Sequence, residues 1–246
     1  MWGEAKVVER IDWSDQLFTL KLSADIGDFV AGQFIKLSLH IDDRRVARAY
    51  SLVNAPHESL LEVLAVSVDD GLLSPRLQAL NPGDSVDIST KAAGFMTLDE
   101  LPDQGSHLWL FATGTAVGPF ISMMRTAKPW LRFERVILVY GVRYQEDLAY
   151  YQELKTFEAQ YPGQFTLVTS VTREPVEGAL SCRITQGVEN GLIEHRVGLS
   201  LNPQDSQVMI CGHPEMIKEL NTLLLSRGLV KNLRRAPGQI TVEKYW

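Results

Sequence analysis

The sequence contains little cysteine, and this scarcity excludes several classes of redox centre. Only two cysteines, Cys182 and Cys211, occur among the 246 residues. A four-cysteine zinc site or a four-cysteine iron–sulfur cluster needs more thiolates than this chain supplies. None of the five histidines lies in an H-x-x-H or H-E-x-x-H arrangement, so no metal site is predicted. Redox chemistry in this chain would therefore need an organic cofactor.

The sequence also lacks an excess of positive charge and a long apolar run. The 24 Lys and Arg residues are outnumbered by 30 Asp and Glu residues, and this balance argues against a protein that coats nucleic acid. The longest uncharged stretch, residues 108–124, is too polar and too broken by glycine and proline for a membrane helix of about 20 residues. The opening MWGEAKVVER has no apolar signal-peptide core, so we expect a cytoplasmic protein without a membrane partner.

What the sequence does contain is a change of pattern near residue 101. Before it, alternating segments bounded by turn residues predict strands at residues 17–22, 33–41, 60–68 and 85–89. After it, continuous apolar runs predict buried parallel strands at residues 107–112, 135–140, 165–171 and 207–211. Helical segments alternate with these runs at residues 118–127, 145–160, 185–189 and 214–226, and residues 238–246 are again β-like. The pattern predicts an α+β two-domain protein, with an antiparallel β-barrel over residues 1–101 and an α/β parallel-sheet domain over residues 102–246.

The segment ATGTAVGP, residues 112–119, is the strongest local signal for a bound ligand. It follows a predicted strand and opens a predicted helix, where backbone N–H groups can bind a pyrophosphate. Its spacing, G-x-x-x-G-P, differs from the G-x-G-x-x-G fingerprint of dinucleotide-binding folds. An ordinary strand-to-helix turn is the alternative for this segment.

A second signal, Arg48-Ala49-Tyr50-Ser51, lies at the end of a further β segment. Alternation places Arg48 and Tyr50 on one face. The cation suits a flavin diphosphate, the tyrosine ring can stack on a flavin and the serine can hydrogen-bond a ring nitrogen. A tyrosine in the barrel core and an arginine in a surface ion pair are the alternative for these residues.

A third signal, Gly71-Leu72-Leu73-Ser74, is a glycine turn after a predicted strand. Ser74 is placed to cap a short helix that begins at Pro75, and a helix N-terminus can hold phosphate. An ordinary capped turn is the alternative.

These three segments, with VMICGHP at residues 208–214 and VEKYW at residues 242–246, occur in the order seen in ferredoxin–NADP reductases. The chain resembles the bacterial flavodoxin/ferredoxin–NADP reductases over essentially its whole length. The resemblance implies an FAD-dependent oxidoreductase that transfers electrons between NADPH, as a hydride, and a one-electron carrier, ferredoxin or flavodoxin. It also implies a monomer.

The resemblance assigns FAD to the first domain. It implies that Arg48 and Ala49 hold the cofactor, that Tyr50 stacks on the isoalloxazine, and that Ser51 lies beside the reactive nitrogen. The further residues implied to line the flavin or to hold its phosphates are Val66, Ser67, Val68, Gly71, Leu72, Leu73 and Ser74.

Charge favours NADP(H) over NAD(H) at the second nucleotide site. A 2′-phosphate prefers arginine forks to an acidic residue, and Arg143, Arg173 and Arg183 each follow a predicted strand. The resemblance implies that arginines at these positions bind that phosphate. The resemblance also implies that Thr115 lies near both cofactors. The other residues implied to bind a cofactor are Thr113, Gly114, Ser170 and Gly212.

The resemblance also assigns roles near the end of the chain. It implies that Cys211 and Gly212 let the nicotinamide approach the flavin, that Glu243 assists proton or hydride chemistry, and that Tyr245 and Trp246 cover the FAD. Ser51, Cys211 and Glu243 are thus the implied catalytic residues. One-electron carriers are acidic, and we predict a basic docking patch formed by Arg125, Lys128, Lys231, Arg234 and Arg235.

Three alternatives to this function differ in observable ways. An NAD(P)H-dependent flavin or oxygenase reductase component without an iron–sulfur domain differs in nucleotide preference and in carrier. A flavin-binding electron-transfer subunit usually carries a four-cysteine segment, which two cysteines cannot supply. A purely structural adaptor would be colourless.

Overall fold

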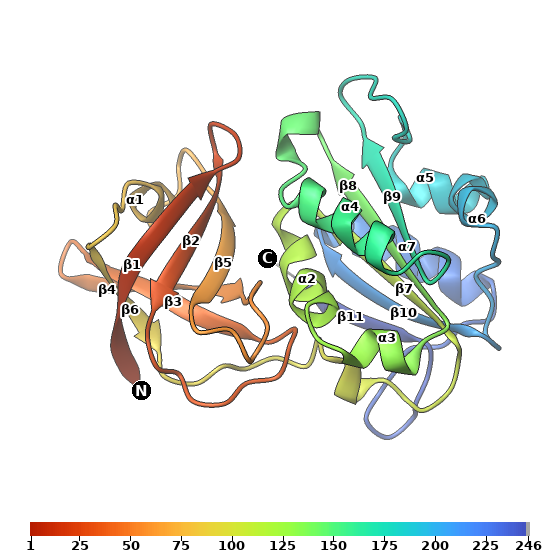
Figure 1. Cartoon of the computed structure of the whole chain (residues 1–246), viewed down its shortest axis with the longest axis horizontal. Coiled ribbons are helices and arrows are strands. Elements are labelled where there is room, and N and C mark those ends of the chain that lie inside the picture. The colour runs from red at the N-terminus through yellow and green to blue at the C-terminus, as the bar shows by residue number, and fades with distance from the viewer. Residues whose placement is uncertain (245–246) are drawn as a thin grey trace. The chain divides into compact units, whose positions relative to one another are not determined.

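The computed structural model describes residues 1–244 (Figure 1). The chain forms two compact units. The first comprises Met1–Thr97 and Gly118–Thr126, and the second comprises Leu98–Val117 together with the chain from Ala127 onward. The short helix that follows the glycine-rich segment therefore packs with the first unit, although the chain on either side of it belongs to the second.

The first unit is built on a six-stranded antiparallel sheet with the order β4-β3-β6-β1-β2-β5. A bridge between Leu52, directly after β4, and Val63 of β5 joins the two ends of this sheet, as a barrel requires. Its core is formed by inward-facing residues such as Phe18, Leu20 and Ile35. The strands are β1 (Trp2–Asp12), β2 (Leu17–Ser23), β3 (Phe34–Ile41), β4 (Arg44–Ser51), β5 (Leu61–Val66) and β6 (Ser85–Ser89), and the helices are α1 (Ser74–Gln78) and α2 (Gly118–Met124).

The second unit is built on a five-stranded parallel sheet with the order β11-β10-β7-β8-β9. Its strands are β7 (His107–Thr113), β8 (Arg135–Val142), β9 (Phe165–Val171), β10 (Ser206–Gly212) and β11 (Ile240–Lys244). Its α-helices are α3 (Lys128–Arg132), α4 (Tyr151–Gln160), α5 (Ile184–Glu189), α6 (Leu192–Val197) and α7 (Pro214–Ser226). Its short 3-10 helices are η1 (Leu98–Glu100), η2 (Gly114–Val117) and η3 (Gln145–Asp147).

Both faces of this parallel sheet carry apolar side chains, on which the helices pack. Side chains of α5, α6 and α7 pack with Trp109, Phe111 and Ile137 of the sheet. Helices α3 and α4 lie in front of the sheet in Figure 1, with α5–α7 behind it. In the described part of the chain no helix has the length and apolar character needed to span a bilayer.

The predicted fold class is confirmed, and β6, β9 and α7 have the predicted bounds. The strand β1, the α-helices α3 and α6 and the short 3-10 helices were not predicted. Strand β1 was not predicted because its sequence, WGEAKVVERID, is rich in charged residues and most of its residues lie partly or fully exposed. The prediction of one helix over residues 145–160 is wrong, because Tyr150 has a positive φ of 59° and separates η3 from α4.

The hairpin between β3 and β4 contains two strained residues and yields a stability prediction. Asp42 and Asp43 have φ of 49° and 59° between the paired residues Ile41 and Arg44, as in a type I′ turn. Glycine adopts this conformation without a Cβ clash, so Asp43→Gly should raise the free energy of unfolding by about 0.5–1 kcal/mol. Asp28→Gly, at an exposed loop position without a positive φ, is the control and should lower it slightly. Urea unfolding of both variants measures the difference, and equal effects would contradict the prediction.

Candidate functional site

Strand β4 of the first unit places Arg48 and Tyr50 on the same face. They lie opposite Leu37 and Ile35 of β3, respectively, and both of these residues belong to the barrel core. Tyr50 is only 9% exposed and belongs to the same core cluster. Burial raises the pKa of the Tyr50 hydroxyl to about 12, while the nearby positive charge of Arg48 acts in the opposite direction. Tyr50 is therefore a neutral phenol at the edge of the core.

The guanidinium of Arg48 is exposed and unpaired. Its Nη1 donates to the carbonyl oxygen of Ala47 at 2.8 Å, and no carboxylate in the described chain pairs with it. The alternative of a surface ion pair at Arg48 is therefore wrong. Ser51, at the end of the same strand, is 2% exposed. The structure thus leaves a free cation beside a buried aromatic ring and a buried hydroxyl group.

The turn at residues 67–74 is closed by its own hydrogen bonds. The Gly71 N–H donates to the Val68 carbonyl oxygen at 2.7 Å, and the Val68 N–H donates to Ser74 Oγ at 3.0 Å. A Cβ at Gly71 would lie 2.8 Å from the Val68 oxygen, so only glycine fits there without a shift. The tightness of the turn thus depends on a residue without a side chain.

The predicted capping role of Ser74 is wrong. Helix α1 begins at Ser74, its N-cap position is Leu73, and no side chain caps it. The Ser74 hydroxyl group instead accepts a hydrogen bond from the Val68 N–H, which closes the turn before the helix begins. Of the residues predicted to line this site, Ser67 and Leu73 are buried, Val66 and Gly71 are half-buried, and Val68 and Leu72 are exposed.

In the second unit, the glycine-rich segment follows the carboxyl end of β7. Gly114 has a φ of 56°, and the segment continues as the 3-10 helix η2 before α2 begins. Thr113 Oγ1 accepts a hydrogen bond from the His213 N–H at 2.9 Å, so the ends of β7 and β10 are tied together. A Cβ at Gly212 would lie 2.1 Å from Thr113 Oγ1, so this junction also requires glycine. Thr115 is 7% exposed within η2.

The three predicted arginines follow strands β8 and β9. Because these strands are parallel, their carboxyl ends lie at one edge of the sheet. The Arg173 N–H donates to the Arg143 carbonyl oxygen at 2.9 Å, so the two loops lie side by side. Ser170 of β9 pairs with Leu180 and its hydroxyl donates to the Cys182 carbonyl, which brings Arg183 beside the same strand.

All three arginine side chains are exposed, and none forms an ion pair within the described residues. Glu174, next to Arg173, instead accepts a hydrogen bond from the Gln145 N–H at 2.5 Å. This contact joins the loops that carry Arg143 and Arg173, and among the described residues Glu174 forms no ion pair with either arginine. Glu174 was not predicted as part of the site. Its position directly after Arg173 is the one signal that the sequence offered.

Cys211 and Glu243 lie opposite each other on the parallel pair β10 and β11. Cys211 is fully buried, and this burial, with a smaller contribution from the negative charge of Glu243, raises the pKa of its thiol well above the ordinary value. The thiol therefore stays protonated at neutral pH and offers no nucleophile. Tyr245 and Trp246, predicted to cover the flavin, lie outside the described residues.

The predicted docking patch loses one member. Arg125 Nη1 lies 2.6 Å from Glu62 and 3.5 Å from Glu58, and its side chain is 15% exposed. It therefore joins the end of α2 to β5 and is not a free surface cation. Lys128 pairs with Asp99. Lys231, Arg234 and Arg235 are exposed in the loop before β11.

Comparison with known proteins assigns both units to a class. Residues 4–95 match the family model described as an oxidoreductase FAD-binding domain, and residues 110–222 match the one described as an oxidoreductase NAD-binding domain. The fold and these matches define a two-domain flavin- and pyridine-nucleotide-dependent oxidoreductase.

Full-length relatives then identify the family. The chain is 45% identical to the flavodoxin/ferredoxin–NADP reductase of Escherichia coli (strain K12), covering 100% of this chain and 99% of the relative. It is 37% identical to the ferredoxin–NADP reductase of Pseudomonas aeruginosa, covering 97% and 95%. The crystal structure of a ferredoxin NADP+ reductase from Neisseria gonorrhoeae with bound FAD and NADP superposes with a TM-score of 0.94 at 30% identity, covering 100% and 99%. The chain belongs to the flavodoxin/ferredoxin–NADP reductase family.

The different burial of the two thiols gives a labelling prediction. Cys182 is partly exposed, whereas Cys211 is fully buried with a raised pKa. Because only an accessible thiolate reacts, iodoacetamide at pH 8 should label Cys182 in the native protein and reach Cys211 only after unfolding. Intact mass and peptide mapping after native and denatured labelling provide the measurement. Labelling of Cys211 in the native protein as fast as Cys182 would contradict the burial described here.

Proposed function

We propose that this chain catalyses electron transfer between NADPH and a one-electron carrier protein, ferredoxin or flavodoxin, with FAD as its bound cofactor. The observation that carries the NADPH assignment is the cluster of three unpaired arginines at one edge of the parallel sheet, in a chain of this family. Bound FAD supplies the step from a two-electron hydride to single electrons. The protein contributes binding, orientation and exclusion of water.

On the FAD side, Arg48 binds the diphosphate, Tyr50 stacks on the isoalloxazine, and Ser51 hydrogen-bonds a ring nitrogen. The free guanidinium of Arg48 and the raised pKa of Tyr50 support this assignment, because the phenol stays neutral beside the ring. The glycine-dependent turn at residues 71–74 holds the phosphates through its backbone, and residues 66–68 line the flavin. Ala49 completes the strand segment. We assign residues 1–101 to this FAD-binding domain.

On the NADP(H) side, Arg143, Arg173 and Arg183 bind the 2′-phosphate. The rest of the site is formed by Thr113, Gly114, Thr115, Ser170 and Gly212. We assign residues 102–246 to the NADP(H)-binding domain. A Cβ at Gly114 would meet nothing within 4 Å, and the absence of a side chain there supports a close approach of the nucleotide at the end of β7.

The reacting positions are Ser51, Cys211 and Glu243. Cys211 contributes a small, protonated side chain beside which the nicotinamide is held, and its buried thiol supports this role. We assign to Glu243 a part in proton or hydride chemistry. The terminal aromatics Tyr245 and Trp246, assigned to cover the FAD, lie outside the described residues. The alternative was an NAD(P)H-dependent flavin or oxygenase reductase component without an iron–sulfur domain, and the full-length relatives support the reductase of ferredoxin or flavodoxin over it.

The carrier docks on basic residues in this proposal. The exposed Lys231, Arg234 and Arg235, without carboxylate partners among the described residues, support a surface for an acidic protein. Arg125 and Lys128 are omitted because each forms an ion pair with a carboxylate of its own unit. A monomeric state and a cytoplasmic location stay predictions.

An anaerobic spectrum of the purified protein tests both cofactors in one experiment. The protein should be yellow, and NADPH should bleach the flavin absorbance far more readily than NADH at the same concentration. If NADH bleaches it equally well, the oxygenase-reductase alternative replaces this proposal. A colourless protein that takes up no added FAD would overturn the FAD assignment.

Single substitutions of the arginines test the 2′-phosphate site. A charge-assisted hydrogen bond contributes about 1.5–3 kcal/mol, so Arg143→Ala, Arg173→Ala or Arg183→Ala should each raise the KM for NADPH roughly 10- to 100-fold. The KM for NADH should stay unchanged, because NADH lacks the phosphate. Lys218→Ala, which removes an exposed charge from α7, is the matched control. Parallel increases in both KM values would argue against the assignment.

A further inference from the structure

The end of β1 and the loop between β1 and β2 contact the turn at residues 67–74 and the helix that follows it, and no role was predicted for this part of the chain. The side chains involved are those of Arg10, Gln16 and Gln78, all within the first unit. We infer that these three are positioning residues that hold the turn for FAD. This inference rests on the proposed function, which places the FAD phosphates at that turn.

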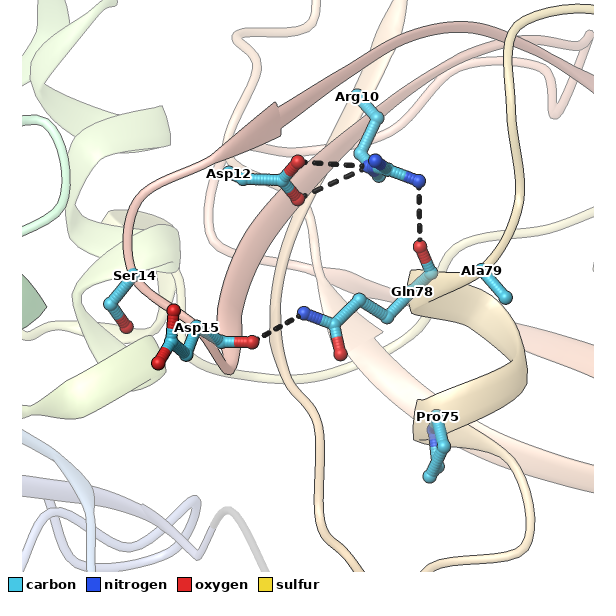
Figure 2. A pocket seen from close by; sticks show the side chains of 7 residues that line it. All are labelled: Arg10, Asp12, Ser14, Asp15, Pro75, Gln78 and Ala79. Carbon is cyan, nitrogen blue, oxygen red and sulfur yellow. Dashed lines mark hydrogen bonds and ion pairs between the residues drawn. The ribbon is translucent and has the colours of Figure 1, made fainter.

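Arg10 holds the end of helix α1, as Figure 2 shows. Its Nη1 donates to the carbonyl oxygens of Gln78 at 2.9 Å and Leu80 at 3.1 Å. Carbonyl groups at a helix C-terminus lack partners within the helix and carry partial negative charge, so a guanidinium is well suited to them. Because a helix of five residues is not stable alone, its place depends on such contacts.

Arg10 is itself held in position. Its Nε lies 3.1 Å from one carboxylate oxygen of Asp12 and 3.2 Å from the other (Figure 2). The Arg10 side chain is 28% exposed, so this pair is partly shielded from solvent. A depression on the surface is lined by Arg10, Asp12, Asp15 and Gln78. The Nε and Nη1 donors of Arg10 point to protein groups there, which argues for an internal role of the guanidinium and against a ligand-binding one.

Three further hydrogen bonds involve the loop between β1 and β2. Gln78 Nε2 donates to the Asp15 carbonyl oxygen at 2.8 Å, which adds a second contact at the end of α1 (Figure 2). Gln16 Nε2 donates to Asp69 Oδ1 at 2.9 Å, and the Gln16 carbonyl oxygen accepts from the Ser67 N–H at 2.8 Å. The end of β1 and this loop together therefore hold the chain both before the turn, at residues 67–69, and after it, at residues 78–80.

These contacts fix both ends of a turn that has almost no side-chain packing of its own. Leu72 is 55% exposed and Val68 is 45% exposed, so within the turn the apolar anchor is Leu73. A turn held at both ends needs less ordering when a ligand binds, and this preorganisation raises affinity. Loss of Arg10 should therefore weaken FAD binding while leaving the NADP(H) site, which lies in the other unit, unchanged.

The test uses the holoenzyme and compares Arg10→Met with Lys6→Met. Lys6 lies on the same strand, pairs with Glu4 at 3.7 Å and makes no contact with the turn. FAD is released by dilution and followed by the increase in its fluorescence. Arg10→Met should raise the Kd for FAD about 10-fold relative to wild type, while Lys6→Met leaves it unchanged. With excess FAD present, kcat and the KM for NADPH should equal the wild-type values, a result that general destabilisation would not give.

Two more variants keep the inference falsifiable if Arg10→Met folds poorly. Gln16→Ala removes one exposed hydrogen bond and should raise the Kd for FAD by a smaller factor. Arg10→Lys keeps the charge and should restore part of the affinity. A Kd for FAD equal to that of Lys6→Met in both Arg10→Met and Gln16→Ala would overturn the inference while leaving the proposed function intact. A wild-type protein that binds no FAD would instead overturn the proposed function itself.

Discussion

The parallel hydrogen-bond ladder from β10 through β7 and β8 to β9 is the constraint on which the nucleotide-binding unit depends. Because every strand runs in the same direction, the loops after β7, β8, β9 and β10 emerge at one edge. The shared strand direction alone brings four of the predicted site residues to that edge: Thr113, Arg143, Arg173 and Gly212. The ladder in turn requires strands whose residues are apolar on both faces, since helices cover the sheet from both sides.

The placement of carboxylates decides which arginines are structural and which are available to a ligand. Glu62 is buried beside Arg125 and holds the end of α2 against β5. The Arg125 guanidinium is therefore neutralised within the protein and is not available to a ligand. Glu174 accepts a backbone N–H and leaves Arg143 and Arg173 unpaired. A guanidinium that stays in water pays no desolvation free energy. When a phosphate binds, it forms strong charge-assisted hydrogen bonds with that phosphate. The same residue type therefore serves two purposes in one chain, and its partners determine which.

Much of the fold was predictable because the relevant signals are local. The strands β6 and β9 and the helix α7 have the predicted bounds, since their periodicity and turn residues lie within a few residues of each other. Strand β1 was missed because most of its residues are exposed and its pattern is dominated by charge. The break at Tyr150 was missed because a left-handed tyrosine leaves no mark on hydrophobic periodicity. Of the site, the motif order pointed to the right family. The predicted capping role of Ser74 was wrong, and Arg125, predicted for the docking patch, is paired with Glu62.

The sequence by itself determined the fold class, the exclusion of a four-cysteine cluster, and the family to which the chain belongs, because composition and motif order are properties of the chain as written. Only the tertiary structure decided which polar side chains are paired. Arg10 meets the carbonyl of Gln78, 68 residues away, and Arg125 meets Glu62, 63 residues away. No local pattern encodes such contacts. They form when strands distant in sequence are brought together by burial of their apolar faces, and at that point the charges and hydrogen-bonding groups carried on those strands find their partners.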